Sequence, residues 1–197
     1  DMIISTNDHA PAVGNVTHAA MEAATPASLA AIRACQTVAA SCLVATEVCN
    51  AGLLIPYTLT GMNPYDMRVK CAKPPLCYDF PNVATYLERP EVRAALGVGS
   101  RKWSDCNHAV ALSFELSGDW MRDYQTMLPD QLNDGIRVLI YAGDQDYICN
   151  WLGNQAWTLA MEWPGKGAFN AANVSPWKKF GELRQSGNFS FCLLYTS

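Results

Sequence analysis

Residues from Arg137 to Trp157, RVLIYAGDQDYICNWLGNQAW, include the side chains best suited to chemistry. Two carboxylates, Asp144 and Asp146, follow directly after an apolar run that ends in Gly143. A carboxylate in this place can bind a metal ion, work in a paired-carboxylate site, or orient the histidine of a triad of nucleophile, base and acid. Further metal ligands do not lie nearby in the sequence. From the local sequence alone, the first interpretation is that both aspartates cap the following turn and helix, as Asp commonly does.

The elements around these aspartates predict an α/β crossover. Residues 136–142 form a continuous apolar run except for Arg137, which is typical of a strand buried on both faces of a parallel sheet. A loop and a helix from about Trp151 follow the run. In such sheets the functional groups lie in loops at the carboxyl ends of the strands, and Asp144 and Asp146 occupy that place.

The composition indicates a soluble domain rather than a nucleic-acid or membrane protein. The chain has 197 residues, of which 50% are hydrophobic, and no apolar span of membrane-crossing length. With 14 basic and 18 acidic residues, there is no basic stripe to bind phosphates. The first ten residues lack the pattern of a signal peptide. Charged residues make up only 16%, which suggests that part of the surface is covered by something outside the chain.

The eight cysteines are best explained by disulfides. They lack zinc-ribbon spacing, and the three histidines do not fall at ligand spacing, so no metal site is expected. Asn15-Val-Thr17 is a candidate glycosylation sequon, and Asn188-Phe-Ser190 is another. Together with the cysteines, these sequons favour the secretory pathway.

Two disulfides can be proposed from spacing. Cys71 and Cys77 bracket the segment AKPPL, whose prolines favour a turn that closes a small loop. Cys35, Cys42 and Cys49 are seven residues apart. In one continuous helix successive sulfurs would lie about 10 Å apart, too far to bond. In a helical hairpin with its turn near residues 37–40, Cys35 would face Cys42, and Cys49 would face residue 28, a serine, or pair elsewhere.

The remaining elements are mostly helical. Residues 1–27 show little periodicity and predict an irregular lead-in, whereas helix-rich sequence begins at Ser28. Two short helices are expected between residues 82 and 98, the second opened by Pro90 and ended by Gly97. A longer helix is expected over residues 109–133, broken or bent near Gly118 and Pro129 and ended by Gly135.

Residues 138–157 closely resemble the segment that carries the triad aspartate in serine carboxypeptidases of the carboxypeptidase Y and cathepsin A type. The resemblance covers roughly residues 28–191, in the family's order and near its spacing, which is far more specific than one motif. It replaces the capping interpretation. The other segments that carry it are CNAGLLIPYTLTGMNPYDMR (49–68), CAKPPLCYD (71–79), YLERPEVRAALGV (86–98), SDCNHAV (104–110), GDWM (118–121) and SGNFSF (186–191).

The resemblance implies an α/β class chain, an incomplete α/β-hydrolase fold with a helical insertion. By position Asp146 corresponds to the family's catalytic acid, and Asp144 is expected to support the loop. The expected organisation is an irregular lead-in (1–27), the helical hairpin of the insertion or cap region (28–60), the C-terminal part of the hydrolase domain (61–191) and an atypical tail (192–197).

The resemblance also implies the walls of a substrate pocket. Cys149 matches a free thiol beside the acyl-side pocket, and a buried free thiol behaves as a small hydrophobe. Leu54, Trp120 and Ile148 match further lining positions of that pocket. Plain core packing is the alternative, and it fits Leu54 and Ile148 best.

Two tyrosines, Tyr65 and Tyr78, match the walls that hold the C-terminal side chain of the substrate. Plain core packing is again the alternative. The two tyrosines and Trp120 fit a pocket better, because aromatic walls with polar tips suit peptide side chains.

Other parts of the family's catalytic machinery are not found in the sequence. It contains no G-x-S-x-G motif, and its histidines, His9, His18 and His108, all precede Asp146. In the family a Gly-His-Met-Val-Pro loop follows the NFSF segment, whereas this chain reads CLLYTS. The family's partner of Cys106 lies upstream, in a region that holds the nucleophile and the oxyanion hole.

The leading hypothesis is a fragment of a serine-type carboxypeptidase that releases C-terminal amino acids from peptides through an acyl-enzyme. It requires no cofactor, and it is inactive alone because the serine and histidine are missing. Its expected partners are the peptide substrate and the missing N-terminal half of the same enzyme. Its expected location is vacuolar, lysosomal or secreted. Two alternatives are an acyltransferase on the same scaffold and a non-catalytic secreted module stabilised by disulfides.

Overall fold

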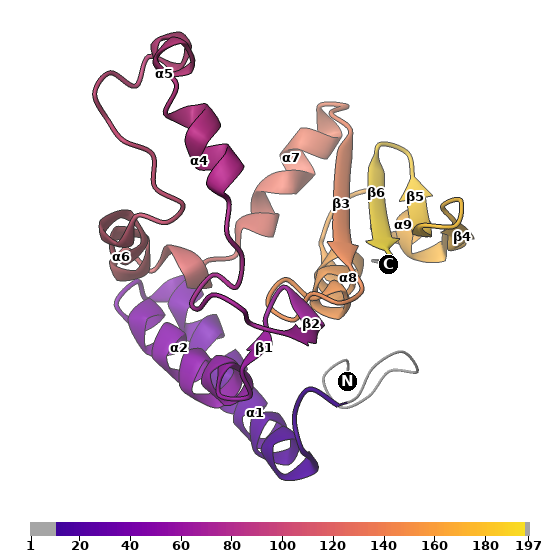
Figure 1. Ribbon diagram of the computed structural model, residues 1–197. Helices are drawn as coiled ribbons and strands as arrows, with labels where there is room; N and C mark the ends of the chain where they lie inside the picture. The colour runs from indigo at the N-terminus through magenta and orange to yellow at the C-terminus, as the bar shows by residue number, and fades with distance from the viewer. Residues whose placement is uncertain (1–10, 196–197) are drawn as a thin grey trace.

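The computed structural model of the protein describes residues 11–195 (Figure 1). Residues 1–10 lie outside this range, together with the expectations that they open an irregular lead-in and form no signal peptide. His9 and the last two residues of the atypical tail also lie outside it. No helix within the described range is long and apolar enough to cross a membrane.

Helices and strands follow one another in the order shown in Figure 1. The helices are α1 (Asn15–Thr37), α2 (Ser41–Cys49), α3 (Ile55–Thr58), α4 (Pro81–Leu87), α5 (Pro90–Leu96), α6 (His108–Leu116), α7 (Leu128–Asn133), α8 (Trp151–Ala160) and α9 (Lys166–Ala171). The strands are β1 (Met62–Asn63), β2 (Asp66–Lys70), β3 (Val138–Gly143), β4 (Ser175–Pro176), β5 (Gly181–Ser186) and β6 (Phe189–Leu194). A π-helical turn, η1 (Asn50–Leu54), joins α2 to α3, and the 3-10 turns η2 (Asp119–Met121) and η3 (Tyr124–Met127) lie between α6 and α7.

The main sheet has the strand order β3, β6, β5, β4. β3 and β6 are parallel and in register from Val138 opposite Phe189 to Gly143 opposite Leu194, whereas β5 runs antiparallel to both of its neighbours. Helix α8 packs against β3 and β6, and α9 packs against β5. The core between helices and sheet contains Leu132, Met161, Phe169, Phe189, Phe191 and Leu193.

The prediction of a strand buried on both faces is wrong. β3 begins at Val138, and Val138 and Ile140 pack on the core of the sheet. Leu139 and Tyr141 are 57% and 67% exposed. Successive side chains of a strand point to opposite faces, so the described chain covers only the face that carries Val138 and Ile140.

A helical hairpin, made of α1 and α2, forms the other main part of the structure, and Figure 1 shows the small β1–β2 hairpin between it and the sheet. The turn at residues 38–40 brings Cys35 and Cys42 into a disulfide, and both side chains are buried. The second disulfide joins Cys71 to Cys77. These are the two pairs favoured by the sequence.

At the end of the hairpin where Cys49 is expected to face residue 28, there is no disulfide. Cys49 is a free thiol, and the buried Ser28 donates its hydroxyl hydrogen to the Ala24 carbonyl oxygen of its own helix at 3.2 Å. The two arms approach closely at Gly52, where an added Cβ would lie 2.7 Å from the Ala24 Cβ. Small residues rather than sulfur therefore set the spacing at this end.

The expected irregular lead-in is wrong for residues 15–27, which form the first half of α1. The segment is rich in alanine, the residue with the highest helix propensity, but it shows little apolar periodicity. Tertiary contacts stabilise this part of the helix, because Met21 packs in a cluster with Tyr57 and Met67. The second arm of the hairpin also continues through η1 to Thr58.

The expected helices of the middle region are partly confirmed. α5 begins at Pro90 and ends before Gly97, which has a left-handed φ of 66°. The break expected near Gly118 is confirmed. Gly118 adopts a φ of 73°, α6 ends at Leu116 and α7 begins only at Leu128, so residues 109–133 do not form one continuous helix. An added Cβ at Gly118 would lie 2.4 Å from the Cys42 Cβ, so only glycine permits this approach to the helical hairpin.

Asn188 follows Gly187 in the turn between β5 and β6 and ties this turn to the end of α7. Its side-chain amide donates hydrogen bonds to the carbonyl oxygens of Leu132 and Ile136, both at 2.8 Å. A glycan on this nitrogen would replace one of the donated hydrogens, so the second sequon does not suit glycosylation in the folded chain. Asn15, in contrast, is exposed at the start of α1.

Replacing Asn188 by aspartate is expected to lower the free energy of unfolding by about 1–3 kcal/mol, because a carboxylate cannot donate to the two carbonyl oxygens. Urea denaturation followed by tryptophan fluorescence measures the change. The matched control is Asn173→Asp, at an exposed loop position, and it should leave the midpoint almost unchanged. Equal midpoints for the two variants would contradict the structural role of the Asn188 amide.

Candidate active site

The acid loop, defined here as residues 144–150, connects β3 to α8. The Asp144 N–H donates to the Leu194 carbonyl oxygen at 2.9 Å, which extends the pairing of β3 and β6 by one bond. The side chain that caps α8 is Asn150, whose Oδ1 accepts from the Gly153 N–H at 2.8 Å. The aspartates are therefore not needed as the cap of this helix.

Asp146 is half-buried near the middle of the acid loop. Its Oδ1 accepts a hydrogen bond from the Cys149 N–H at 2.8 Å. The Cys149 side chain is a free thiol at the surface of the described chain. Partial desolvation, and second the negative charge of Asp146, raise the pKa of this thiol. The thiol is thus protonated and weakly nucleophilic at neutral pH.

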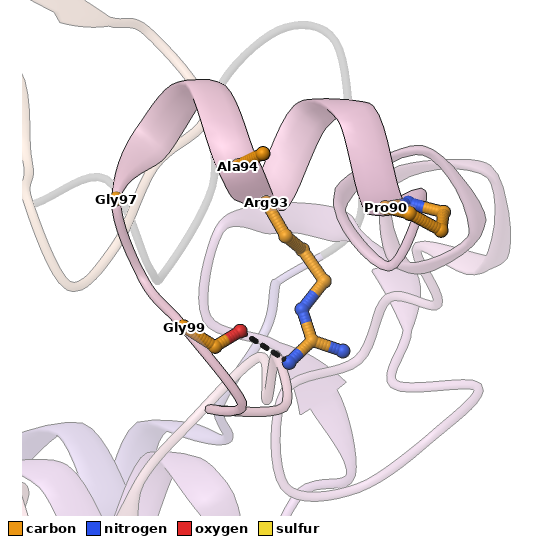
Figure 2. Close-up of a pocket in the computed structure, with 5 residues that line it drawn as sticks. All are labelled: Pro90, Arg93, Ala94, Gly97 and Gly99. Atoms are coloured by element: carbon orange, nitrogen blue, oxygen red, sulfur yellow. Dashed lines mark hydrogen bonds between the residues drawn. The ribbon is translucent and has the colours of Figure 1, made fainter.

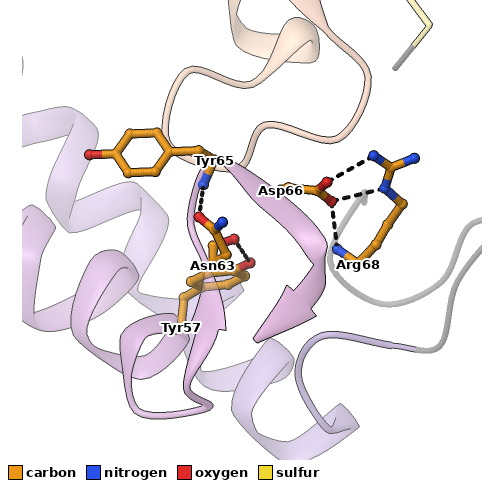
Figure 3. Close-up of polar contacts among 5 residues, drawn as sticks. All are labelled: Tyr57, Asn63, Tyr65, Asp66 and Arg68. Carbon is orange, nitrogen blue, oxygen red and sulfur yellow. Dashed lines mark hydrogen bonds and ion pairs between the residues drawn. The ribbon is translucent and has the colours of Figure 1, made fainter. Parts of the chain in front are cut away.

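The β1–β2 hairpin lies against the acid loop and is anchored by its own polar contacts (Figure 3). Arg68 donates to both carboxylate oxygens of Asp66, through Nε at 2.9 Å and Nη2 at 2.8 Å. This bond is the main cause that raises the Arg68 pKa, and the charge of Asp144 contributes less. Asp144 therefore lies close enough to Arg68 for their charges to interact. The charge of Asp146 is not among the causes that shift the Arg68 pKa.

The predicted walls Tyr65 and Tyr78 are brought together. Their ring centroids are 6.0 Å apart, and both rings are partly exposed. Tyr65 sits in the turn of the β1–β2 hairpin, where its N–H donates to the Asn63 Oδ1 at 2.9 Å. In Figure 3 its ring extends to the side opposite the Asp66–Arg68 pair. Phe80 also belongs to this aromatic group, because its ring centroid lies 6.3 Å from that of Tyr78. In the sequence, the only indication of this contact is that Phe80 follows Tyr78 by two residues.

Two other predicted pocket residues lie in the acid loop and in η1. Ile148 is partly exposed within the acid loop, and its N–H donates to the Pro64 carbonyl oxygen at 3.1 Å. Leu54 is half-buried at the end of η1. The carbonyl of its neighbour, Leu53, accepts a bond from the Tyr147 hydroxyl at 2.9 Å, so η1 and the acid loop are in contact.

Trp120 lies in η2 against the helical hairpin. It lines a shallow cavity of about 320 Å³ together with Ile32, Arg33 and Gln36 of α1. Among the described residues that line this cavity, none belongs to the acid loop. The structure therefore joins Trp120 to the insertion side of the molecule and gives no direct contact between it and Asp146.

A larger hollow of about 530 Å³ lies on α5 and contains none of the predicted site residues (Figure 2). Among the residues of the described chain that line it, the charged one is Arg93, which donates to the Gly99 carbonyl oxygen at 2.7 Å and to the Glu88 Oε2 at 3.2 Å. The arginine therefore holds the loop that follows α5.

The histidines of the described chain lie outside the acid loop. His18 is buried in α1, where its Nδ1 lies 3.5 Å from the Glu22 Oε2. His108 is exposed as the first residue of α6. Residues 11–195 also hold no group of three or more His, Cys, Asp or Glu side chains arranged to bind a metal ion.

Comparisons with known proteins agree with one another. The family model described as serine carboxypeptidase matches residues 6–197. The chain is 46% identical to carboxypeptidase Y homolog A of Trichophyton tonsurans over 165 residues, which cover 78% of the chain and 30% of the relative. For the homolog A of Ajellomyces capsulatus, identity is 41% over 187 residues, covering 89% and 34%. The chain thus spans about a third of these curated relatives.

A solved structure has the same fold. The crystal structure of Kex1(delta)p, a prohormone-processing carboxypeptidase from Saccharomyces cerevisiae, matches with a TM-score of 0.67 and 20% identity. The match covers 98% of this chain and 44% of that one. At this identity the likeness is evidence for the fold alone. It confirms the expected α/β class and the incomplete α/β-hydrolase fold.

Proposed function

The chain belongs to the serine carboxypeptidase family, and from this premise we propose that it supplies the catalytic acid and part of the substrate pocket of a serine-type carboxypeptidase. The observation that carries the proposal is the family match over residues 6–197 combined with the position of Asp146, directly beyond a parallel strand. Carboxyl ends of parallel strands are where such folds place functional groups.

In the proposed reaction a serine attacks the terminal peptide bond, a histidine relays its proton, and Asp146 accepts the Nδ1 hydrogen of that histidine. Asp146 holds the imidazole in the correct tautomer and stabilises the imidazolium that forms. The bond from the Cys149 N–H to the Asp146 Oδ1 limits rotation of the carboxylate and supports this role. The serine and the histidine lie outside the 197 residues, and no cofactor takes part.

The substrate pocket follows the same proposal. Tyr65 and Tyr78 hold the C-terminal side chain of the peptide, and their 6.0 Å spacing supports a shared wall. Leu54, Trp120, Ile148 and Cys149 line the acyl-side pocket. For Trp120 this role requires that η2 approach the acid loop, because the cavity that Trp120 lines in the described chain includes residues of α1 and none of the acid loop.

The proposed organisation places the hydrolase part in residues 61–191 and the insertion in the helical hairpin, which the structure extends to the start of α1. Disulfides such as Cys35–Cys42 and Cys71–Cys77 form and persist in oxidising compartments. Together with the exposed Asn15 sequon, they support a vacuolar, lysosomal or secreted location.

The proposed function predicts that the 197-residue chain alone releases no C-terminal amino acid from blocked dipeptides. The full-length enzyme that contains it, with the serine and histidine, should release them at ordinary enzymatic rates of about 1–1000 s⁻¹. The measurement is amino-acid release by the two proteins at equal concentration. Turnover by the chain alone would refute its inactivity. Acyl transfer to an added alcohol without peptide hydrolysis by the full-length enzyme would identify it as an acyltransferase instead.

A further inference from the structure

The acid loop is held on both sides of Asp146 by the β1–β2 hairpin. Before Asp146, the Gln145 carbonyl oxygen accepts from the Met67 N–H at 3.0 Å. After it, the N–H groups of Tyr147 and Ile148 both donate to the Pro64 carbonyl oxygen, at 3.0 and 3.1 Å. With three bonds on its neighbours, the backbone that carries the carboxylate has little freedom to shift.

A pair of stacked tyrosines connects this loop to the insertion. The rings of Tyr57 and Tyr147 are 3.9 Å apart at an interplanar angle of 9°. Tyr57 is fully buried, and its hydroxyl donates to the Asn63 carbonyl oxygen at 2.9 Å. The Tyr147 hydroxyl donates to the Leu53 carbonyl oxygen at 2.9 Å, so each phenol is fixed at its polar tip. Burial raises the pKa of Tyr147 to about 12, so this donor keeps its hydrogen at any physiological pH.

The same contacts also hold Tyr65, one of the two tyrosines proposed to contact the C-terminal side chain of the substrate. Asn63, the last residue of β1, is buried. Its carbonyl oxygen accepts from the Tyr57 hydroxyl, and its side-chain Oδ1 accepts from the Tyr65 N–H. Tyr65 and Asp146 are therefore attached to one rigid unit, the β1–β2 hairpin. A displacement of this hairpin would move the acid and the substrate wall together.

We infer that Tyr147, stacked on Tyr57, is a positioning residue that fixes Asp146 relative to the substrate pocket. This inference rests on the proposed function, because it assumes that Asp146 is the catalytic acid. Tyr147 itself touches no reacting atom. It acts by holding the backbone of the acid loop, and a displacement of about 1 Å at a catalytic group can lower the rate by about 100-fold.

The test compares Tyr147→Leu and Tyr147→Phe in the full-length enzyme that contains this chain. Leucine removes the stacked ring and the hydroxyl, so kcat is expected to fall by about 100-fold. Phenylalanine keeps the ring and loses only the bond to the Leu53 carbonyl, so kcat should fall by about 3- to 10-fold. KM should change by less than about threefold for both variants, because the positioning affects the transition state. Tyr86→Leu, at an exposed tyrosine of α4, is the matched control with wild-type kcat.

Amide hydrogen exchange provides the second readout. In Tyr147→Leu the N–H groups of residues 147 and 148 should exchange at least about tenfold faster than in the wild type. If Tyr147→Leu does not accumulate as folded protein, the kcat of Tyr147→Phe is the deciding measurement. A wild-type kcat in Tyr147→Phe overturns the inference.

Failure of the inference can be separated from failure of the proposed function. Absence of carboxypeptidase activity in the wild-type enzyme would contradict the proposed function. An active wild type that is inactivated by Asp146→Asn but keeps its kcat in Tyr147→Leu would overturn only the positioning role. A raised KM with unchanged kcat would also overturn it, because Tyr147 would then act on substrate binding.

Discussion

Replacing Asp146 by asparagine in the full-length enzyme is expected to lower kcat by about 10,000-fold. An asparagine side chain can present its NH₂ group to the imidazole and hold it in the wrong tautomer, although its shape matches that of aspartate. The loss should appear in kcat more than in KM, because the carboxylate stabilises the imidazolium that forms in the transition state. Steady-state hydrolysis of blocked dipeptides measures both constants.

Two further variants make this result specific to one carboxylate. Asp134→Asn, at the exposed end of α7, is the matched control and should keep wild-type kinetics. Asp144→Asn should cause a smaller loss, because Asp144 is expected only to support the loop and its charge acts on Arg68. If Asp144→Asn abolished activity while Asp146→Asn retained it, Asp144 would be the catalytic acid.

Replacing Phe189 by alanine should lower the free energy of unfolding by about 3–5 kcal/mol. Phe189 is fully buried at the start of β6, with its ring centroid 4.7 Å from that of Phe169 and 5.6 Å from that of Trp163. The Trp163 ring meets it edge-on at 78°, a favourable aromatic geometry. Alanine would therefore leave a cavity between the sheet and the helices. Urea denaturation followed by tryptophan fluorescence measures the loss.

Phe114 in α6 provides the matched control, because about half of its surface is exposed. Phe114→Ala should change the free energy of unfolding by about 0.5 kcal/mol or less. Similar losses in the two variants would mean that β6 is not packed as described. A loss at Phe189 below about 1 kcal/mol would have the same meaning.

Residues with a strong local signal could be predicted from the sequence. Pro90 and Gly97 fix the ends of α5 through backbone geometry that belongs to these residues alone. The Cys71–Cys77 loop follows from short spacing. Asp146 could be proposed only through the family resemblance, because capping was the first interpretation that the local sequence gave for an aspartate in that position.

Features that depend on distant contacts could not be predicted. In the first half of α1, Met21 is buried because it packs in a cluster with Tyr57, and the alanines of this segment give no period. The bonds from the acid loop to the Pro64 carbonyl oxygen use backbone groups, which every sequence has. The burial of β3 on one face depends on which elements cover the sheet, and the apolar run does not carry that information.

The position of β6 between β3 and β5 has a consequence for the order of folding. The β5–β6 ladder closes over a tight turn, whereas the β3–β6 ladder must wait for about 50 intervening residues to collapse. Local hairpins form in about 1–10 μs, much faster than distant parallel pairing. During synthesis, Asp146 leaves the ribosome long before Leu194, whose carbonyl oxygen secures the beginning of its loop. The geometry of the acid loop is therefore among the last features of this polypeptide to mature.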